Sequence, residues 1–367
     1  MNFNVFRQLA DKFEINTIEK INPPYGIPAK IISKLLRSVG MKGSFPAFTT
    51  ARLNRIKKLV EEKIQNDAAY NFYHGVTPWI YVKNKLPYAL YTDACFATYI
   101  GVYHDDSRFG QRQLNRIFNK EKEFLSKADV VFFSSEWALE DTKKCYGLAG
   151  NNFSVAGLGG GYEKKTIIKV EATAPYFLFV GLDFVGKGGY TVCDAFERLS
   201  KKFPDFMLKL VGQRPPEKYL QNKKISYCGF FNKVIASESK ALKDLFSGAY
   251  CFLLPTVKDM TPLVLVEAGS VGCPAISVNN FGIPEIVING QTGILLNKNE
   301  LTKDSLLSAM ETICSDLQRR NNWGINAEKY IEENFSWQKT GAKICDELEK
   351  NFYANKFSDC ENVPVKK

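Results

Sequence analysis

The chain has 367 residues, of which 45% are hydrophobic and 24% charged, and this composition is typical of a globular protein large enough for two domains. Lysine and arginine outnumber aspartate and glutamate by 49 to 39, so the net charge is +10. A charge of this sign favours an anionic partner such as a phosphate-bearing substrate or an acidic lipid headgroup. No zinc-finger, RNP-like or basic-zipper pattern occurs in the sequence, which argues against nucleic acid as that partner.

Cysteine usage and the N-terminal residues indicate the compartment. The nine cysteines are scattered and include no C-x-x-C pair, which is typical of a reducing environment and predicts neither a disulfide framework nor a zinc site. Charged residues occur early, at Arg7, Asp11 and Lys12, and no apolar run approaches the roughly 20 residues of a membrane span. We therefore expect a cytoplasmic protein.

The first part of the chain predicts helices where a nucleotide-binding domain normally opens with a central strand. Residues 1–10 have apolar side chains at helical spacing, and 13–18 form only a short strand candidate,. We therefore predict an N-terminal domain that lacks its first strand: either the chain is shortened, or another segment takes the central position. Residues 30–63 predict two helices, the first basic and amphipathic. That helix suits an anionic membrane surface and equally an ordinary packed surface, so a peripheral location on the inner face of the membrane remains open.

Apolar runs over 68–73 and 88–92 predict buried parallel strands, each followed by a helix,. Their carboxyl ends carry His74 and Asp93, and ligands of open α/β sheets bind beyond those ends. Both side chains are candidates for contact with an acceptor substrate. Asp93 is equally suited to cap the next helix, and His74 to an ordinary position at the rim of a site. Residues 128–135 predict a further strand.

A second α/β half is predicted to follow a linker that begins at the glycine run 157–161 and ends near Pro175. Strand 176–181 leads into a glycine-rich loop that carries Lys187. Glycines such as Gly181 let the backbone approach a ligand closely, and a lysine there supplies a point charge for a diphosphate. A strand that ends at Gly212 follows.

The next strand–loop–helix unit predicts an anion site. Strand 250–254 is followed by Thr261, which is predicted to cap a helix, and by Pro262, which suits the first helical position,. The free N–H groups of Leu263 and Val264 would then face an anion, typically phosphate.

Two carboxylates flank that helix start. Asp259 precedes it, and Glu267 lies inside the helix and leans back toward its N-terminus,. Carboxylates only accept hydrogen bonds, so they suit hydroxyl-rich groups on either side of a phosphate, such as a ribose and a sugar. The alternative is a helix cap followed by a solvated glutamate.

At these residues the sequence resembles the retaining family 4 glycosyltransferases of the glycogen-phosphorylase-like superfamily. Residues 259–268, DMTPLVLVEA, are similar to the acidic–x7–Glu motif E-G-F-G-x-x-x-x-E-A. Residues 91–96, YTDACF, resemble the T-D-A-T-F element of one branch, and 181–189 resemble its V-G-x-D-W-x-x-K-G-G loop. Asp259 replaces a glutamate, Pro262 a glycine and Leu182 an arginine of the family pattern.

The resemblance implies the GT-B fold, in which two Rossmann-like α/β domains face each other across a cleft. We expect an acceptor domain over 1–170, with the helix 336–355 packed back on it, a donor domain over 171–335 and a tail over 356–367. Three residues are implied in catalysis: Asp93, Lys187 and Asp259. The expected donor-binding residues are Gly181, Lys187, Gly212, Asp259, Met260, Thr261, Leu263, Val264 and Glu267.

The function implied is transfer of a sugar, with retention, from a nucleotide diphosphate sugar to a glycan or lipid-linked acceptor. We expect no cofactor and no metal, because nothing in the sequence resembles the D-x-D site of the other major glycosyltransferase fold. Two alternatives remain: a sugar-nucleotide epimerase, and a non-catalytic relative that acts as a binding partner.

Overall fold

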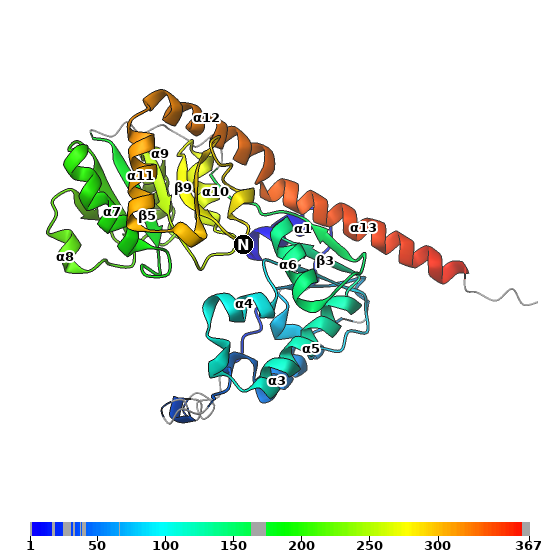
Figure 1. Ribbon diagram of the computed structural model, residues 1–367. Helices are drawn as coiled ribbons and strands as arrows, with labels where there is room; N and C mark the ends of the chain where they lie inside the picture. Colours follow the sequence, from blue (N-terminus) through cyan, green and yellow to red (C-terminus); the bar gives the residue numbers. More distant parts are fainter. Residues whose placement is uncertain are drawn as a thin grey trace, which may run out of the picture. The chain divides into compact units, whose positions relative to one another are not determined.

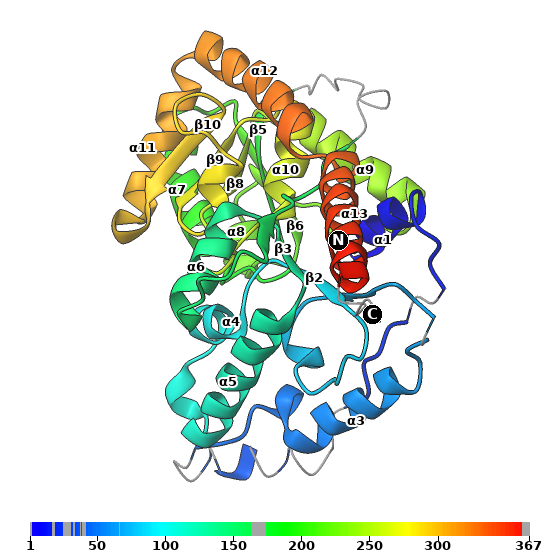
Figure 2. The same ribbon diagram turned by 90° about the vertical axis from the view of Figure 1, so that its right-hand side faces the viewer.

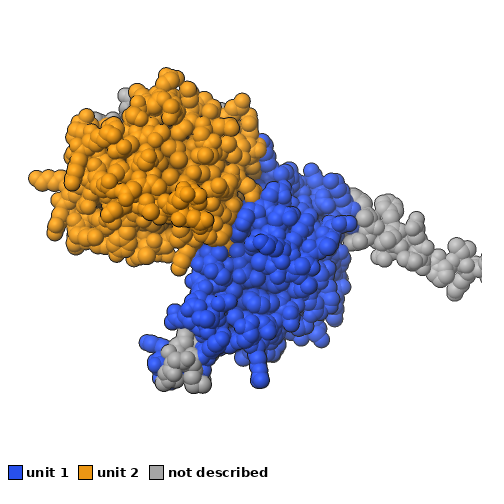
Figure 3. Space-filling view, viewed as in Figure 1, with its two compact units in different colours: residues 1–157, 337–367 blue, residues 158–336 orange. Residues whose placement is uncertain are grey.

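The structure is a computed structural model that describes residues 2–16, 19–24, 31, 34–36, 38, 42–65, 67–162 and 174–361. It divides into two compact units, coloured in Figure 3: an N-terminal unit of residues 1–157 with 337–367, and a C-terminal unit of residues 158–336. The sequence placed the division at residue 170, whereas the C-terminal unit begins at Leu158.

The N-terminal unit contains a parallel four-stranded sheet in the order β1-β2-β3-β4, of which β3 is labelled in Figure 1. Its strands are β1 (Asn71–His74), β2 (Tyr88–Thr92), β3 (Val130–Phe133) and β4 (Phe153–Val155). Its α-helices are α1 (Asn2–Ala10), α3 (Thr50–Glu61), α4 (Phe96–Tyr103), α5 (Gln111–Lys127), α6 (Glu136–Tyr146) and α13 (Trp337–Glu361). The described part of this unit also contains the short 3-10 helices η1 (Pro46–Phe48), η2 (Thr77–Trp79) and η3 (Asp106–Arg108).

The segments before and after β1 differ in part from the predictions. Among the described residues before Asn71 there is no strand, as expected for a domain without its usual first strand. The predicted strand over 13–18 is therefore wrong for residues 13–16, and 17–18 lie outside the described residues. β1 is followed by the turn η2 and not by a helix. Most of the predicted basic helix before Gly43 also lies outside the described residues.

The sheet of this unit is covered on both faces, which explains why its strands read as continuous apolar runs. Successive side chains of a strand point to opposite faces. Accordingly, Ala89 and Tyr91 of β2 pack with residues of α1 and α13, whereas Leu90 packs with residues of α3, α4 and α5. Helices α1 and α13, from the two ends of the chain, lie side by side (Figure 2). Gly341 of α13 allows this approach, since a Cβ there would lie 2.3 Å from Gln8 Cβ.

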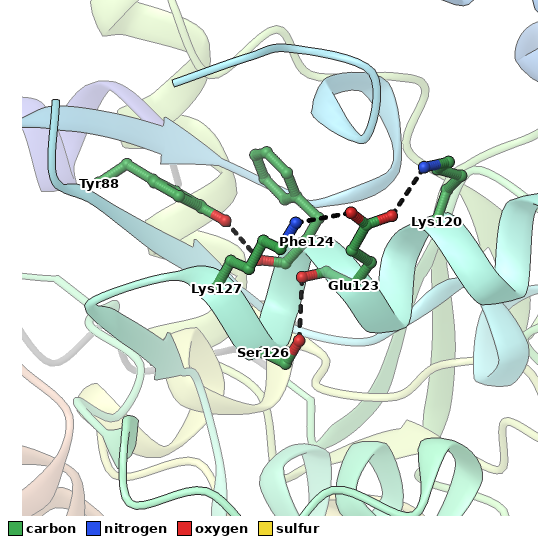
Figure 4. A network of polar contacts seen from close by, with 6 residues as sticks. All are labelled: Tyr88, Lys120, Glu123, Phe124, Ser126 and Lys127. Atoms are coloured by element: carbon green, nitrogen blue, oxygen red, sulfur yellow. Dashed lines mark hydrogen bonds and ion pairs between the residues drawn. The ribbon is translucent and has the colours of Figure 1, made fainter. Parts of the chain in front are cut away.

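The C-terminal end of α5 is fastened to β2 (Figure 4). The Tyr88 hydroxyl donates to the Phe124 carbonyl oxygen at 2.7 Å, and Tyr88 is buried. Glu123 accepts from Lys120 and Lys127, both at 2.7 Å. These ion pairs are solvent-exposed and contribute little to stability, so the buried tyrosine hydrogen bond and the packing of the apolar face of α5 in the core hold this helix.

The C-terminal unit contains a parallel six-stranded sheet in the order β10-β9-β8-β5-β6-β7. Its strands are β5 (Tyr176–Gly181), β6 (Met207–Gly212), β7 (Ile225–Tyr227), β8 (Cys251–Leu254), β9 (Ala275–Asn279) and β10 (Gly293–Asn297). Its helices are α7 (Gly189–Lys202), α8 (Glu217–Leu220), α9 (Ala236–Ser247), α10 (Leu263–Ser270), α11 (Lys303–Cys314) and α12 (Leu317–Asn334), with the 3-10 turns η5 (Ile283–Glu285) and η6 (Lys298–Glu300).

This strand order is that of a doubly wound Rossmann sheet, in which the chain first winds outward from one central strand and then returns to wind the other way. Phe177 and Phe179 of β5 pack on one face with apolar residues of α7 and α11. On the opposite side, Gly269 of α10 lies against Ile331 of α12, where a Cβ would be 2.7 Å from Ile331 Cγ1. The reversal of winding falls between β5 and β8, and ligands of such sheets bind at this switch point.

Candidate functional site

The switch point brings together two residues that the sequence separates widely. Lys187 lies in the loop after β5, Asp259 lies in the loop after β8, and β5 and β8 are neighbours in the sheet. Lys187 Nζ donates to Asp259 Oδ2 in an ion pair. Both side chains are largely withdrawn from solvent, with exposed fractions of 23% and 17%. Burial raises the pKa of Asp259, and the neighbouring Lys187 charge opposes that rise.

Tight packing of the two loops fixes this pair. Gly188 has a φ of +83°, and a Cβ there would lie 2.4 Å from the Pro255 carbonyl oxygen. The Thr256 hydroxyl donates to the Gly186 carbonyl oxygen at 3.2 Å. Because the backbone of one loop rests directly on the other, the positions of Lys187 and Asp259 are coupled.

Gly181 and Gly212 end the neighbouring strands β5 and β6, as predicted. The structure shows that a glycine is needed at position 212 for packing and not only for the approach of a ligand. Gly212 has a φ of +108°, and a Cβ there would lie 2.1 Å from the Gly181 carbonyl oxygen. The Gln213 N–H donates to that same oxygen at 2.9 Å. The glycine at position 212 is thus required by the packing of one strand end on the other, whatever ligand approaches.

Helix α10 begins one residue later than predicted. Its first residue is Leu263, and Pro262 is the N-cap without a side-chain cap bond. The prediction that Thr261 caps the helix is therefore wrong. The fixed φ of proline suits the extended N-cap backbone that is found here,. Among the described residues, no hydrogen bond is found for the backbone N–H groups of Leu263 and Val264, so both remain available at the positive end of the helix.

Glu267 is also paired, with a residue that sequence reasoning missed. Lys233 Nζ donates to both carboxylate oxygens of Glu267, at 2.5 and 2.7 Å. The Glu267 side chain is 14% exposed, so the alternative of a solvated glutamate is wrong. Lys233 lies in the loop between β7 and α9, outside every motif identified in the sequence. A basic residue beyond the end of a strand was the only signal for it.

The turn after β9 supports the loop that carries Asp259. The Gly282 N–H donates to the Met260 carbonyl oxygen at 2.9 Å, and the Met260 side chain is buried. Phe281 adopts a φ of +55°, a left-handed conformation uncommon outside glycine,. Two buried polar atoms of these loops, Thr261 Oγ1 and Asn280 Nδ2, have no hydrogen-bond partner among the described residues. Buried polar groups are usually satisfied, so the loops carry unused hydrogen-bonding capacity.

The acceptor-side candidates belong to the N-terminal unit. His74 is the last residue of β1, its Nε2 is buried without a partner among the described residues, and its ring lies 5.8 Å from that of Tyr91. Burial lowers the pKa of His74 to about 4, so the imidazole is neutral near pH 7. Asp93 is exposed beyond β2. The alternative that it caps α4 is wrong, because Cys95 holds the N-cap position.

Within the C-terminal unit, the site therefore consists of two lysine–carboxylate pairs and the start of α10. Each carboxylate can exchange its lysine for hydroxyl donors, and each lysine can turn to an anion. Unpaired buried carboxylates would be costly, so the pairs keep the site stable without a ligand. The arrangement is chemically suited to a ligand with a diphosphate between two polyhydroxylated groups.

Comparisons with known proteins identify the C-terminal unit. Residues 163–330 match the family model of the glycosyl transferases group 1. The matched residues coincide almost entirely with the C-terminal unit, which contains both lysine–carboxylate pairs. Among the described helices, none combines the length and apolar character needed to cross a membrane.

Individual relatives and solved structures agree with this match. The chain is 23% identical over 322 residues to the D-inositol 3-phosphate glycosyltransferase of Corynebacterium glutamicum. The aligned region covers 81% of this chain and 75% of the relative. Sucrose-phosphate synthase from Thermosynechococcus elongatus has a similar fold, with a TM-score of 0.66, 16% identity and coverage of 94% and 87%. HepE of Anabaena, solved with UDP and glucose, gives a TM-score of 0.58 at 15% identity and coverage of 86% and 88%.

The chain spans about half or less of the length of other curated relatives that it matches, with shares of 48, 26 and 44%. The fold prediction is confirmed, since both units are parallel α/β sheets and the solved neighbours are GT-B glycosyltransferases. Residues 163–330 therefore match the group 1 glycosyl transferases, and the solved neighbours share the fold of the chain.

Proposed function

We propose that this protein transfers a sugar, with retention of configuration, from a nucleoside diphosphate sugar to a glycan or lipid-linked acceptor. The observation that carries the proposal is the Lys187–Asp259 pair at the switch point, beside the free N–H groups that open α10. A cation and helix N–H groups favour a diphosphate, and a carboxylate next to them favours sugar hydroxyls.

In this reaction the bound donor replaces the lysine–carboxylate contacts of both ion pairs with its own contacts. The diphosphate takes Lys187 from Asp259, whose carboxylate then accepts hydroxyl groups of the sugar. The ribose donates to Glu267. As the glycosidic bond to phosphate breaks, negative charge grows on the leaving oxygen, where Lys187 and the N–H groups of Leu263 and Val264 stabilise it. Solved neighbours with UDP and glucose support this assignment of ligand class.

On the acceptor side we assign Asp93 as the residue that orients the attacking hydroxyl. His74 is neutral near pH 7, so it serves as a hydrogen-bonding group and not as a cation. The leaving phosphate can itself take the acceptor proton, so no cofactor and no catalytic metal are required. A relative named for D-inositol 3-phosphate supports a polyhydroxylated acceptor. We place the reaction in the cytoplasm, at the inner membrane face if the acceptor is lipid-linked.

The proposal is tested by incubating purified protein with a panel of nucleotide sugars, with and without membrane extract, and measuring nucleoside diphosphate release and labelled product. Transfer that needs an acceptor, and that Glu267→Ala abolishes, supports it. A changed sugar nucleotide formed from the donor alone indicates an epimerase. Donor binding that leads to no release with any acceptor fraction indicates a binding protein, a role that the exposed Leu182 in place of an arginine would suit.

A further inference from the structure

A cluster of two thiols and one carboxylate, all potential metal ligands, lies in the N-terminal unit, apart from the proposed donor-binding residues,. One ligand atom each of Cys95, Asp141 and Cys145 lies within 4.8 Å of the other two. Cys95 is the N-cap residue of α4, while Asp141 and Cys145 lie one turn apart on α6. Residues four apart share one face of a helix, so α6 presents a carboxylate and a thiol together toward the start of α4.

The hydrogen bonds of the cluster already orient the carboxylate. The Thr98 hydroxyl donates to Asp141 Oδ2, and Cys95 Sγ lies 3.2 Å from that hydroxyl oxygen. Cys145 Sγ donates to the same carboxylate oxygen at 3.8 Å. Among the described residues, no lysine or arginine forms an ion pair with Asp141. The three potential metal-ligand atoms therefore lie close together without a lysine or arginine charge between them.

We propose that Cys95, Asp141 and Cys145 bind a Zn²⁺ ion, with a water molecule as the fourth ligand. Zinc can bind thiolate and carboxylate ligands in a tetrahedron with Zn–S near 2.3 Å, which places two sulfurs about 3.8 Å apart. Ligand atoms that lie within 4.8 Å of one another can approach this geometry by side-chain rotation. Binding releases the two thiol protons. Cys95 is buried, whereas Cys145 is exposed, so the ion enters from the α6 side.

The ion would act structurally. It would clamp the start of α4 to α6 and thereby fix the segment after β2, in which Asp93 precedes Cys95 by two residues. Thr98, which is largely buried, would hold the liganding carboxylate from behind, a supporting role common around metals,. This inference does not depend on the proposed transfer reaction, since its test measures metal binding and stability alone.

The test is a Co²⁺ titration of the reduced full-length protein. We expect one equivalent of Co²⁺ to produce a thiolate-to-cobalt charge-transfer band and the visible bands of tetrahedral cobalt, and Zn²⁺ to bleach both. Zn²⁺ should also raise the melting temperature. Cys145→Ser and Asp141→Asn should each weaken binding about 100-fold or more, and Thr98→Val about 10- to 100-fold. Cys314→Ser, which changes a half-buried cysteine of the C-terminal unit, should bind like the parent chain.

Two results would overturn the proposal. One is a cobalt spectrum that is absent, or that Cys145→Ser leaves unchanged. The other is a reduced protein that binds no Co²⁺ but loses two hydrogens to a thiol oxidant such as diamide, with Cys95 and Cys145 joined in the resulting peptide map. In that case the two thiols are a redox pair and the carboxylate is only their neighbour.

Discussion

Lys233 reaches across from the loop after β7 and binds both oxygens of Glu267, at 2.5 and 2.7 Å. Glu267 is the residue that the family resemblance assigned to the ribose. In the structure both of its carboxylate oxygens instead accept hydrogen bonds from a lysine that belongs to no recognised motif. Lys187 also pairs with a carboxylate, Asp259, through its Oδ2 atom. Both carboxylates of the proposed donor site thus carry a matching cation, and under our proposal a donor rearranges these pairs when it binds.

Removal of Lys233 should weaken donor binding without slowing the chemical step. In Lys233→Ala, the Glu267 carboxylate loses its cation and faces an anionic donor with uncompensated charge. We expect the donor KM to rise about tenfold, a loss of about 1.4 kcal/mol, with kcat nearly unchanged and a weaker effect at high salt. Steady-state kinetics at two ionic strengths measure this.

The double variant Lys233→Ala/Glu267→Gln separates charge from geometry. Without the negative charge on residue 267, loss of the lysine should cost far less, so the double variant should bind donor about as well as Glu267→Gln alone. An additive loss would contradict the charge-balance explanation.

Removal of Lys187 should instead reduce catalysis. The pairing with Asp259 holds the Lys187 ammonium close to the start of α10. In the proposed reaction, negative charge develops on the leaving phosphate at this place. Lys187→Ala should lower kcat/KM about 100-fold or more and destabilise the C-terminal unit by about 2 kcal/mol, because Asp259 is left buried without a partner. Lys201→Ala, on the exposed end of α7, is the control. Equal rates in the two variants would contradict the assigned role.

Two glycine substitutions separate backbone strain from a steric clash. Gly212 and Gly229 both have positive φ angles, +108° and +89°. A Cβ at 212 would meet the Gly181 carbonyl oxygen at 2.1 Å, whereas, adjacent residues aside, no atom in the described part of the chain lies within 4 Å of a Cβ at 229. Gly212→Ala should therefore destabilise the fold by about 3 kcal/mol or more, and Gly229→Ala by only about 1 kcal/mol. Chemical denaturation followed by tryptophan fluorescence compares them.

The buried histidine should make stability depend on pH. The pKa of His74 is lowered from 6.5 to about 4 by burial, so between these values the unfolded chain binds more protons than the folded one. The free energy of unfolding should therefore fall as the pH is lowered from about 6.5 to about 4, by up to about 1.4 kcal/mol per pH unit. His74→Gln should remove this contribution.

Nuclear magnetic resonance can test the titration directly, because the chain contains only two histidines. The imidazole signal that is absent from His74→Gln belongs to residue 74, and it should shift only near pH 4. A midpoint near 6.5 would contradict burial of the ring and return His74 to a rim position.

The sequence alone determined the parallel strands and located the motifs of the proposed donor site. Continuous apolar runs such as 88–92 and 176–181 are buried on both sheet faces, so their pattern predicts strands with nearly exact bounds,. The glycine-rich loop with Lys187 and the acidic–x7–Glu spacing are local in sequence and were recognised from it. The start of α10 was predicted one residue too early, because Thr261 is a favourable N-cap residue by type whereas Pro262 holds the N-cap position in the structure,.

Contacts between distant segments were decided only by the tertiary structure. Lys187 meets Asp259 because β5 and β8 become neighbours at the reversal of winding, and Lys233 meets Glu267 because a loop returns from the sheet edge. Cys95 likewise meets Asp141 and Cys145 only when α4 packs beside α6. Such pairings depend on strand order and loop path, and no local spacing of residues encodes either.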